Sequence, residues 1–205
     1  MKERRELEKQ MRRSQILDAA RNLLFSHGIE NVSISKISKE AELGVGTIYF
    51  HYKNKEEIFI ALQQEGLSIF YSIISQIAQK DDAAHEQLRQ IADAYYEFCQ
   101  SQSEYYNIIN YFLSSSKVFF QADLKQQVDM AGSKILRVIQ NIVVSGIEDG
   151  LFDEKEPAKF SAMFWGTLHG LFQFKKLEQT ALGNQDHKGI YDYSVEKLIR
   201  GILST

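Results

Sequence analysis

The near absence of proline, combined with apolar residues at helical spacing, limits the possible folds of this chain more than any other feature. Pro157 is the only proline among the 205 residues, and long stretches contain no cluster of glycines. Proline breaks the interior of a helix, so its scarcity leaves long helices possible. Apolar residues recur every three or four positions along most of the sequence. We therefore predict an all-α protein with a buried core.

The spacing of apolar residues and the capping residues give the positions of the helices. Gly28 follows the last periodic residue of the first helix, and Ser33 and Asn54 are suited to cap the second and fourth helices. The predicted helices cover residues 7–27, a second segment with Ile34, Ile37 and Ala41 on one face, a short third segment around 45–52, and then residues 55–80, 84–101, 104–114, 123–148, 157–180 and 190–203.

The stretch LGVGTIYFHYKNKEE, residues 43–57, is ambiguous between a strand and a helix. Residue propensities alone favour a strand, but a strand here would carry aromatic rings on both faces and have no hydrophilic side. A helix instead places Val45, Ile48 and Tyr52 on one buried stripe and turns Phe50 outward. We therefore expect a short helix, which completes a helix-turn-helix with the two helices before it.

Residues 14–58 carry a recognisable set of motifs. The first helix of this segment carries ILDAA and LF and is followed by a glycine. The end of the segment carries GTIY followed by KNKEE. This segment resembles the DNA-binding domain of TetR-family transcriptional regulators. The resemblance implies a helix-turn-helix DNA-binding domain at residues 1–54. It also implies a larger helical effector-binding and dimerisation domain at residues 55–205, beginning with a linking helix at 55–80.

Two positions depart from the usual pattern of that family. Glu42 stands where a glycine is common, and Gly44 stands where serine or threonine is common. If residue 42 has a left-handed backbone, a side chain there costs roughly 1–2 kcal/mol. Gly44 can still cap a helix but has no hydroxyl to offer a phosphate.

The outward face of the third helix and the resemblance together predict a DNA interface. By resemblance, Tyr49 places its hydroxyl on a phosphate and Lys55 grips another. Alternatives stay open at this point, because Phe50 could pack on a neighbouring helix, Tyr49 could close the small core, and His51 could be merely solvated. The predicted DNA-binding residues are Ser33, Lys36, Gly44, Gly46, Thr47, Tyr49, Phe50, His51 and Lys55, and the predicted inner residues of the helix are Val45, Ile48 and Tyr52.

Charge is distributed unevenly along the chain. The first 55 residues carry 11 basic and 7 acidic side chains, whereas the remainder carries 13 basic and 20 acidic ones. A basic segment on an acidic body is typical of a protein with a local polyanion contact. Arg12, Arg13 and the basic residues before them could form an arm over the minor groove, although a solvated charge run is the alternative.

One helix-turn-helix contacts too few base pairs for specificity, so we expect a homodimer on double-stranded DNA with an inverted-repeat operator. The segment 160–174 is apolar around most of its circumference and must be covered on several sides. Gly166 and Gly170 would permit close helix approach. Burial within one subunit is the alternative. The predicted dimer interface, by resemblance the last two helices, consists of Phe164, Leu168, Leu171, Phe172, Val195, Leu198, Ile199 and Ile202.

The middle of the chain is rich in aromatic residues, which could line a cavity for a small, largely apolar effector that is lipid-like, an acyl thioester or aromatic. An ordinary packed core is the alternative. The family's usual outcome, repression relieved by ligand, is expected here. The predicted effector-pocket residues are Tyr95, Phe98, Tyr111, Phe112, Phe119, Trp165 and His169.

Several classes of protein are disfavoured by composition. The single cysteine, Cys99, excludes an intrachain disulfide and fits a reducing cytoplasm. The five histidines show no metal-ligand spacing and no nucleophile motif is visible, so neither an enzyme nor a cofactor or metal site is expected. The charged N-terminus predicts no secretory signal, and the uncharged run 160–174 is shorter than the roughly 20 residues of a membrane span. The remaining alternative is a ligand-independent, architectural DNA-binding protein.

Overall fold

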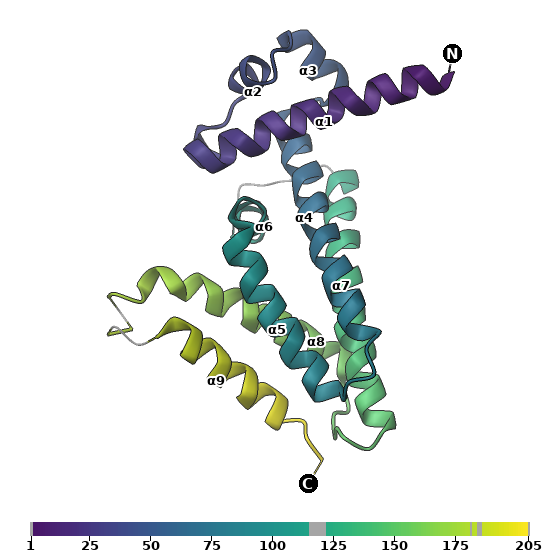
Figure 1. The fold of residues 1–205 in the computed structure, drawn as a ribbon, viewed down its shortest axis with the longest axis vertical. Helices are drawn as coiled ribbons and strands as arrows, with labels where there is room; N and C mark the ends of the chain where they lie inside the picture. Colours follow the sequence, from purple (N-terminus) through teal and green to yellow (C-terminus); the bar gives the residue numbers. More distant parts are fainter. Residues whose placement is uncertain (1, 115–121, 181, 184–185, 205) are drawn as a thin grey trace. The chain divides into compact units, whose positions relative to one another are not determined.

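The computed structural model describes residues 2–114, 122–180, 182–183 and 186–204. The described residues form nine α-helices, two short 3-10 helices and no β-strand (Figure 1). This confirms the predicted all-α fold. The helices are α1 Lys2–His27, α2 Ile34–Glu40, α3 Val45–His51, α4 Lys55–Ala78, α5 Ala84–Ser101, α6 Ser103–Ser114, α7 Ala122–Glu148, α8 Pro157–Gln173 and α9 His187–Arg200, with 3-10 helices at Ile29–Asn31 and Phe174–Leu177.

The chain divides into two compact units. Unit 1 comprises residues 1–67 and 102–129, and unit 2 comprises residues 68–101 and 130–205. Helices α4 and α7 therefore each contribute residues to both units. The functional boundary predicted after residue 54 stays a prediction.

The core of unit 1 joins the three N-terminal helices to the first part of α4 and to α6. It is formed by fully buried apolar side chains, among them Ile16, Ala20, Ile37, Ile48, Ile58, Leu62 and Ile108. Helices α4 and α6 approach so closely that a Cβ atom placed on Gly66 would lie 2.7 Å from the Cβ of Tyr105. On the neighbouring surface, Arg21 donates two hydrogen bonds to the Glu65 carboxylate, at 2.9 and 2.8 Å.

The core of unit 2 is an aromatic cluster between α5, α8, α9 and the second part of α4. Phe70 packs on Tyr95 with a ring-centroid distance of 5.3 Å, and Tyr95 packs on Trp165 at 4.7 Å. Helix α8 faces this core with a stripe spaced four residues apart, Phe160, Phe164, Leu168 and Phe172, all buried. The Tyr191 hydroxyl ties α9 to α5 by donating to the Ala92 carbonyl at 2.8 Å.

Most helix ends agree with the predictions, and three differ. Helix α1 begins at Lys2 rather than near residue 7, and α9 begins at His187 because Asp186 caps it by accepting from the Lys188 and Gly189 amides. Helix α8 ends at Gln173 rather than continuing to residue 180. A side chain from α9 meets this end of α8, since His187 Nε2 donates to the carbonyl of Leu171 at 2.8 Å and so satisfies an acceptor of the last turn.

Helix α4 is, by length and apolar composition, able to cross a membrane, but half of its most apolar window is buried within the protein. Ile58, Phe59 and Leu62 from this helix are fully buried in the core of unit 1. Its hydropathy is therefore accounted for by its role as a core helix.

Candidate nucleic-acid interface

The turn between α2 and α3 is a Schellman motif with an unusual residue at its left-handed position. The Leu43 amide donates to the Ser38 carbonyl at 2.9 Å, and the Glu42 amide donates to the Lys39 carbonyl at 3.2 Å. Glu42 has φ 53°, which is the backbone conformation that favours glycine. The chain therefore keeps the geometry of the turn despite the side chain, at the strain cost anticipated from the sequence.

Helix α3 is anchored by Ile48, which is fully buried, and by Tyr52, which caps the helix and is 2% exposed. Gly44 is the N-cap residue and offers no side chain, while its carbonyl accepts from the Thr47 amide at 2.8 Å. The prediction that Val45 lies inside was wrong, since its side chain is 43% exposed. The preceding turn directs Leu43 against the core of unit 1 instead, so the first residue of α3 lies at the rim.

The face of α3 opposite Ile48 is exposed and aromatic. Phe50 is 80% exposed and Tyr49 is 54% exposed. The ring of Phe50 contacts the adjacent His51, with centroids 5.1 Å apart, so the alternative in which Phe50 packs on a neighbouring helix does not hold. A Cβ atom placed on Gly46 would have no neighbour within 4 Å, and a partner could approach the backbone closely there. Thr47 is half-buried beside this face.

The first turns of α2 and α4 supply further polar groups. Ser33 caps α2 as predicted, because its Oγ accepts from the Lys36 amide at 3.3 Å. The Lys36 amine donates to the Asn31 carbonyl at 2.8 Å, which holds it at the N-terminal end of α2. At α4, the Asn54 side chain accepts from the Glu57 amide at 2.9 Å, confirming the predicted cap.

Lys55 occupies the first position of α4, where free backbone amides and the helix dipole favour an anion. Its Nζ lies 5.4 Å from the centroid of the Phe59 ring in the same helix. Phe59 is fully buried and supports the stem of the lysine side chain. The amine is thus held at the N-terminal end of α4 by a cation–π contact.

Cations of α1 lie near the C-terminal end of α3. The Arg13 guanidinium lies 4.5 Å from the centroid of the Tyr52 ring. Burial lowers the pKa of His51 below its ordinary 6.5, and three cations of α1 lower it further, namely Arg13, Lys9 and Arg12. His51 is therefore neutral at physiological pH, within an electropositive surface.

The predicted effector-pocket residues fall into two groups. Tyr95, Phe98, Trp165 and His169 belong to the aromatic cluster of unit 2, where Tyr95 Oη lies 2.6 Å from His169 Nδ1. Tyr111 and Phe112 belong to unit 1, where Tyr111 contacts Phe59 and Phe112 joins the core. The predicted effector pocket stays a prediction. Phe119 lies outside the described residues.

Most of the predicted dimer-interface residues are buried inside the subunit. Phe164, Leu168, Phe172, Val195, Ile199 and Ile202 are each at most 8% exposed, so their assignment to a surface between subunits was wrong. Leu171 and Leu198 are half-buried. Because α8 is apolar around most of its circumference, its sequence did not show which stripe faces the core.

The outer face of α8 carries a different set of residues. Met163 is 49% exposed, as is Phe174 in the C-cap position after the helix, and Gly166 and Gly170 have open space where a Cβ would lie.

Comparison with known proteins decides the family. The profile of bacterial regulatory proteins of the tetR family matches residues 16–62, and that of the tetracyclin repressor-like C-terminal domain matches residues 88–198, more than half of the chain. The chain belongs to the TetR family. It is accordingly a transcriptional regulator that binds DNA through its helix-turn-helix, as predicted, and members of this family are regulators rather than enzymes.

Individual TetR-family relatives extend the comparison. The fatty acid metabolism regulator protein of Bacillus subtilis is 26% identical over 155 residues, which cover 75% of this chain and 78% of the relative. The structure of FadR from Bacillus subtilis in complex with stearoyl-CoA has a TM-score of 0.75 at 24% identity, covering 92% of this chain and 98% of that one. AibR in complex with isovaleryl coenzyme A and operator DNA has a TM-score of 0.70 at 19% identity, covering 92% and 98%.

Proposed function

We propose that this protein is a cytoplasmic, homodimeric repressor that leaves an inverted-repeat operator when it binds an acyl thioester. The observation that carries the DNA-binding part is the exposed face of α3. A phenylalanine that is 80% exposed beside a bare glycine backbone has no packing role within unit 1, and it suits contact with thymine methyl groups and sugar edges in a major groove. The effector class is supported by the fatty acid regulator and the two acyl-CoA complexes among the relatives.

The DNA-binding roles can be separated by two substitutions. Lys55→Ala removes a phosphate contact, so it should weaken binding to all sequences and reduce the slope of log affinity against log salt by about 0.9. Phe50→Ala should remove operator preference while leaving non-specific binding intact. Both are measured by fluorescence anisotropy on a duplex enriched by the wild-type protein from a random-sequence pool. An equal loss of specific and non-specific binding in Phe50→Ala would contradict base readout.

The effector class can be tested with the only tryptophan of the chain. Trp165 lies in the aromatic cluster of unit 2, with its ring 4.7 Å from Tyr95 and 5.6 Å from Phe70, so a ligand entering there should change its fluorescence. We expect palmitoyl-CoA to change Trp165 emission and to release the DNA in the same concentration range. Free coenzyme A and palmitate serve as controls. Release without any change in Trp165 emission would place the effector site elsewhere.

A ligand-independent architectural protein is the second candidate, and the close packing of the Tyr95 cluster favours it. Tyr95, Phe70 and Phe164 are all fully buried, as in an ordinary core. This candidate requires that acyl thioesters leave DNA binding unchanged, which the same titration decides.

We further propose that the outer face of α8 is the dimer interface. The open positions at Gly166 and Gly170, flanked by exposed Met163, allow a second helix to approach closely. Gly170→Glu should therefore produce monomers in sedimentation experiments and lose operator specificity. Gly132→Glu is the matched control, because Gly132 in α7 also has open space around it. A Gly170→Glu protein that sediments as the wild type does would contradict this interface.

A further inference from the structure

The N-terminal part of α1 extends beyond the core of unit 1 as a regular helix. Residues 3–14 are all exposed, and the first buried side chain is Ile16. At 1.5 Å per residue, the helix before Ile16 is about 20 Å long. The arm suggested by the basic sequence is therefore helical, and its side chains have fixed directions.

A stripe of cations on this extension continues the buried stripe of the same helix. Ile16 and Ala20 are fully buried and lie four residues apart. Counting back from Ile16 in steps of four, three and four residues reaches Arg12, Lys9 and Arg5. Residues at these spacings lie on one face of a helix. The face of α1 that packs on the core thus becomes a cationic face where the core ends.

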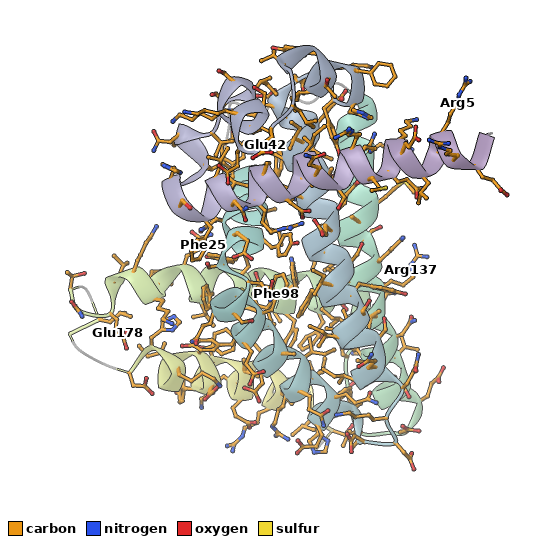
Figure 2. The ribbon with its side chains drawn as sticks, turned by 45° about the horizontal axis from the view of Figure 1, so that its top comes forward. Arg5, Phe25, Glu42, Phe98, Arg137 and Glu178 are labelled. Carbon is orange, nitrogen blue, oxygen red and sulfur yellow. The ribbon has the colours of Figure 1, made fainter. Side chains whose placement is uncertain are left out.

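Independent contacts place this cationic face on the side of α3. Arg13, next to the stripe, lies over Tyr52, the residue that caps α3. The charges of Lys9 and Arg12 act on His51 in the last turn of α3. In Figure 2 the Arg5 side chain projects from the N-terminal part of α1 toward the side of unit 1 that carries α3.

The cations of the extension differ in whether they form ion pairs. Arg4, about 100° around the helix from Arg5, pairs with Glu8 at 3.0 Å. Among the described side chains, no carboxylate forms an ion pair with Arg5, Lys9 or Arg13. A groove of about 640 Å³ between α1 and α2 borders the stripe at Arg12, and its lining also includes Glu8, Asp18, Glu40 and Glu42. Arg5 and Lys9 are therefore left without a carboxylate partner among the described side chains, so their charge is available to a polyanion.

We infer that the N-terminal extension of α1 is a second DNA-binding element, in which Arg5 and Lys9 bind backbone phosphates flanking the half-site read by α3. This inference rests on the proposed DNA-binding function. The extension adds affinity and fixes the position of the domain on the duplex but reads no base, because its cations face phosphates. Arg5 and Lys9 are about 6 Å apart along the helix, so each can reach a separate phosphate.

The test compares Arg5→Gln, Lys9→Gln and the double variant with Arg4→Gln, which removes the same charge from a direction about 100° around the helix. The probe is the duplex enriched by the wild-type protein, with flanks of ten additional base pairs or none. On the flanked duplex, the slope of log affinity against log salt should fall by about 0.9 for each single variant and by about 2 for the double variant. Arg4→Gln should leave the slope unchanged.

Each outcome is decisive. On the duplex without flanks, wild-type and double-variant proteins should bind with the same slope, because the phosphates that Arg5 and Lys9 contact are missing. Equal slopes of wild-type and double-variant proteins on the flanked duplex would overturn the inference while leaving the DNA-binding function of α3 intact. The same reduction in Arg4→Gln as in Arg5→Gln would also overturn it, because net charge rather than a face would then be responsible. A wild-type protein that shows no salt-dependent DNA binding would overturn the inference and the proposed function together.

Discussion

Gly66 in α4 has no room for a methyl group. A Cβ atom there would lie 2.7 Å from the Cβ of Tyr105 and 2.8 Å from its Cγ. The nearest atom is attached directly to the α6 backbone, so a change of rotamer cannot move it away. An ordinary contact needs at least about 3.4 Å, so Gly66→Ala should force α4 and α6 apart by roughly 0.7 Å or distort one of them.

Two opposing effects determine the stability of Gly66→Ala. Alanine in a helix interior is favoured over glycine by about 1 kcal/mol. Overpacking of a well-filled core costs about 1–3 kcal/mol. We therefore expect the free energy of unfolding of Gly66→Ala to fall by about 0–2 kcal/mol. Gly132→Ala in α7 is the matched control, because its Cβ would meet nothing within 4 Å, so it should gain about 1 kcal/mol.

Urea denaturation followed by circular dichroism measures both variants against the wild-type protein. The two alanine variants should differ by about 1–3 kcal/mol, with Gly132→Ala the more stable. If Gly66→Ala were as stable as Gly132→Ala, the steric reasoning about the contact between α4 and α6 would be refuted. An unchanged m-value in all three proteins is required for the comparison, since a change would indicate a different extent of unfolding.

Three other predictions follow from single side chains. Glu42→Gly should raise the free energy of unfolding by about 1 kcal/mol in urea denaturation, because glycine adopts the positive φ without strain; no gain would show that the turn is unstrained. Arg21→Met removes the bonds to Glu65, which is 39% exposed, so solvent screening keeps the expected loss of stability to about 1 kcal/mol, and a cycle with Glu65→Gln should show coupling between the two residues. Burial lowers the pKa of His169 below 6.5, so the unfolded chain takes up a proton first as the pH falls through 6.5, and stability should drop as the pH falls below that value. This drop should be smaller in His169→Gln when both are measured by urea denaturation, and an equal drop in both proteins would assign it to other groups.

The sequence was sufficient to predict the helix-turn-helix. It did not show that Leu43, rather than Val45, packs against the core at the turn. The spacing of Ile48 and Tyr52 identified the buried stripe of α3, and both are buried. Extending the stripe to Val45 assumed a regular helix on both sides of the turn. The Schellman motif instead turns Leu43 inward, and its geometry depends on backbone bonds that periodicity does not reveal.

The body of the protein was predictable in its helices and less so in its faces. A helix such as α8, with apolar residues around most of its circumference, has more than one stripe that could face the core. Only the packing of α5 and α9 against Phe164 and Leu168 distinguishes the inner stripe from the outer one with Met163. The contact at the end of α8 could not be predicted from the sequence either. The hydrogen bond from His187 to the Leu171 carbonyl joins residues that are 16 positions apart.

The buried stripe of α1 runs directly into its cationic stripe. The direction of the cations therefore depends on the number of residues between them and Ile16. One alanine inserted after Ser14 would rotate the whole extension by about 100° and turn Arg5 and Lys9 away from α3, with no change in charge. Four inserted residues would nearly restore the direction and lengthen the helix by about 6 Å. In this part of the chain, related sequences should therefore exchange one basic residue for another freely, but should tolerate insertions only in steps close to a whole helical turn.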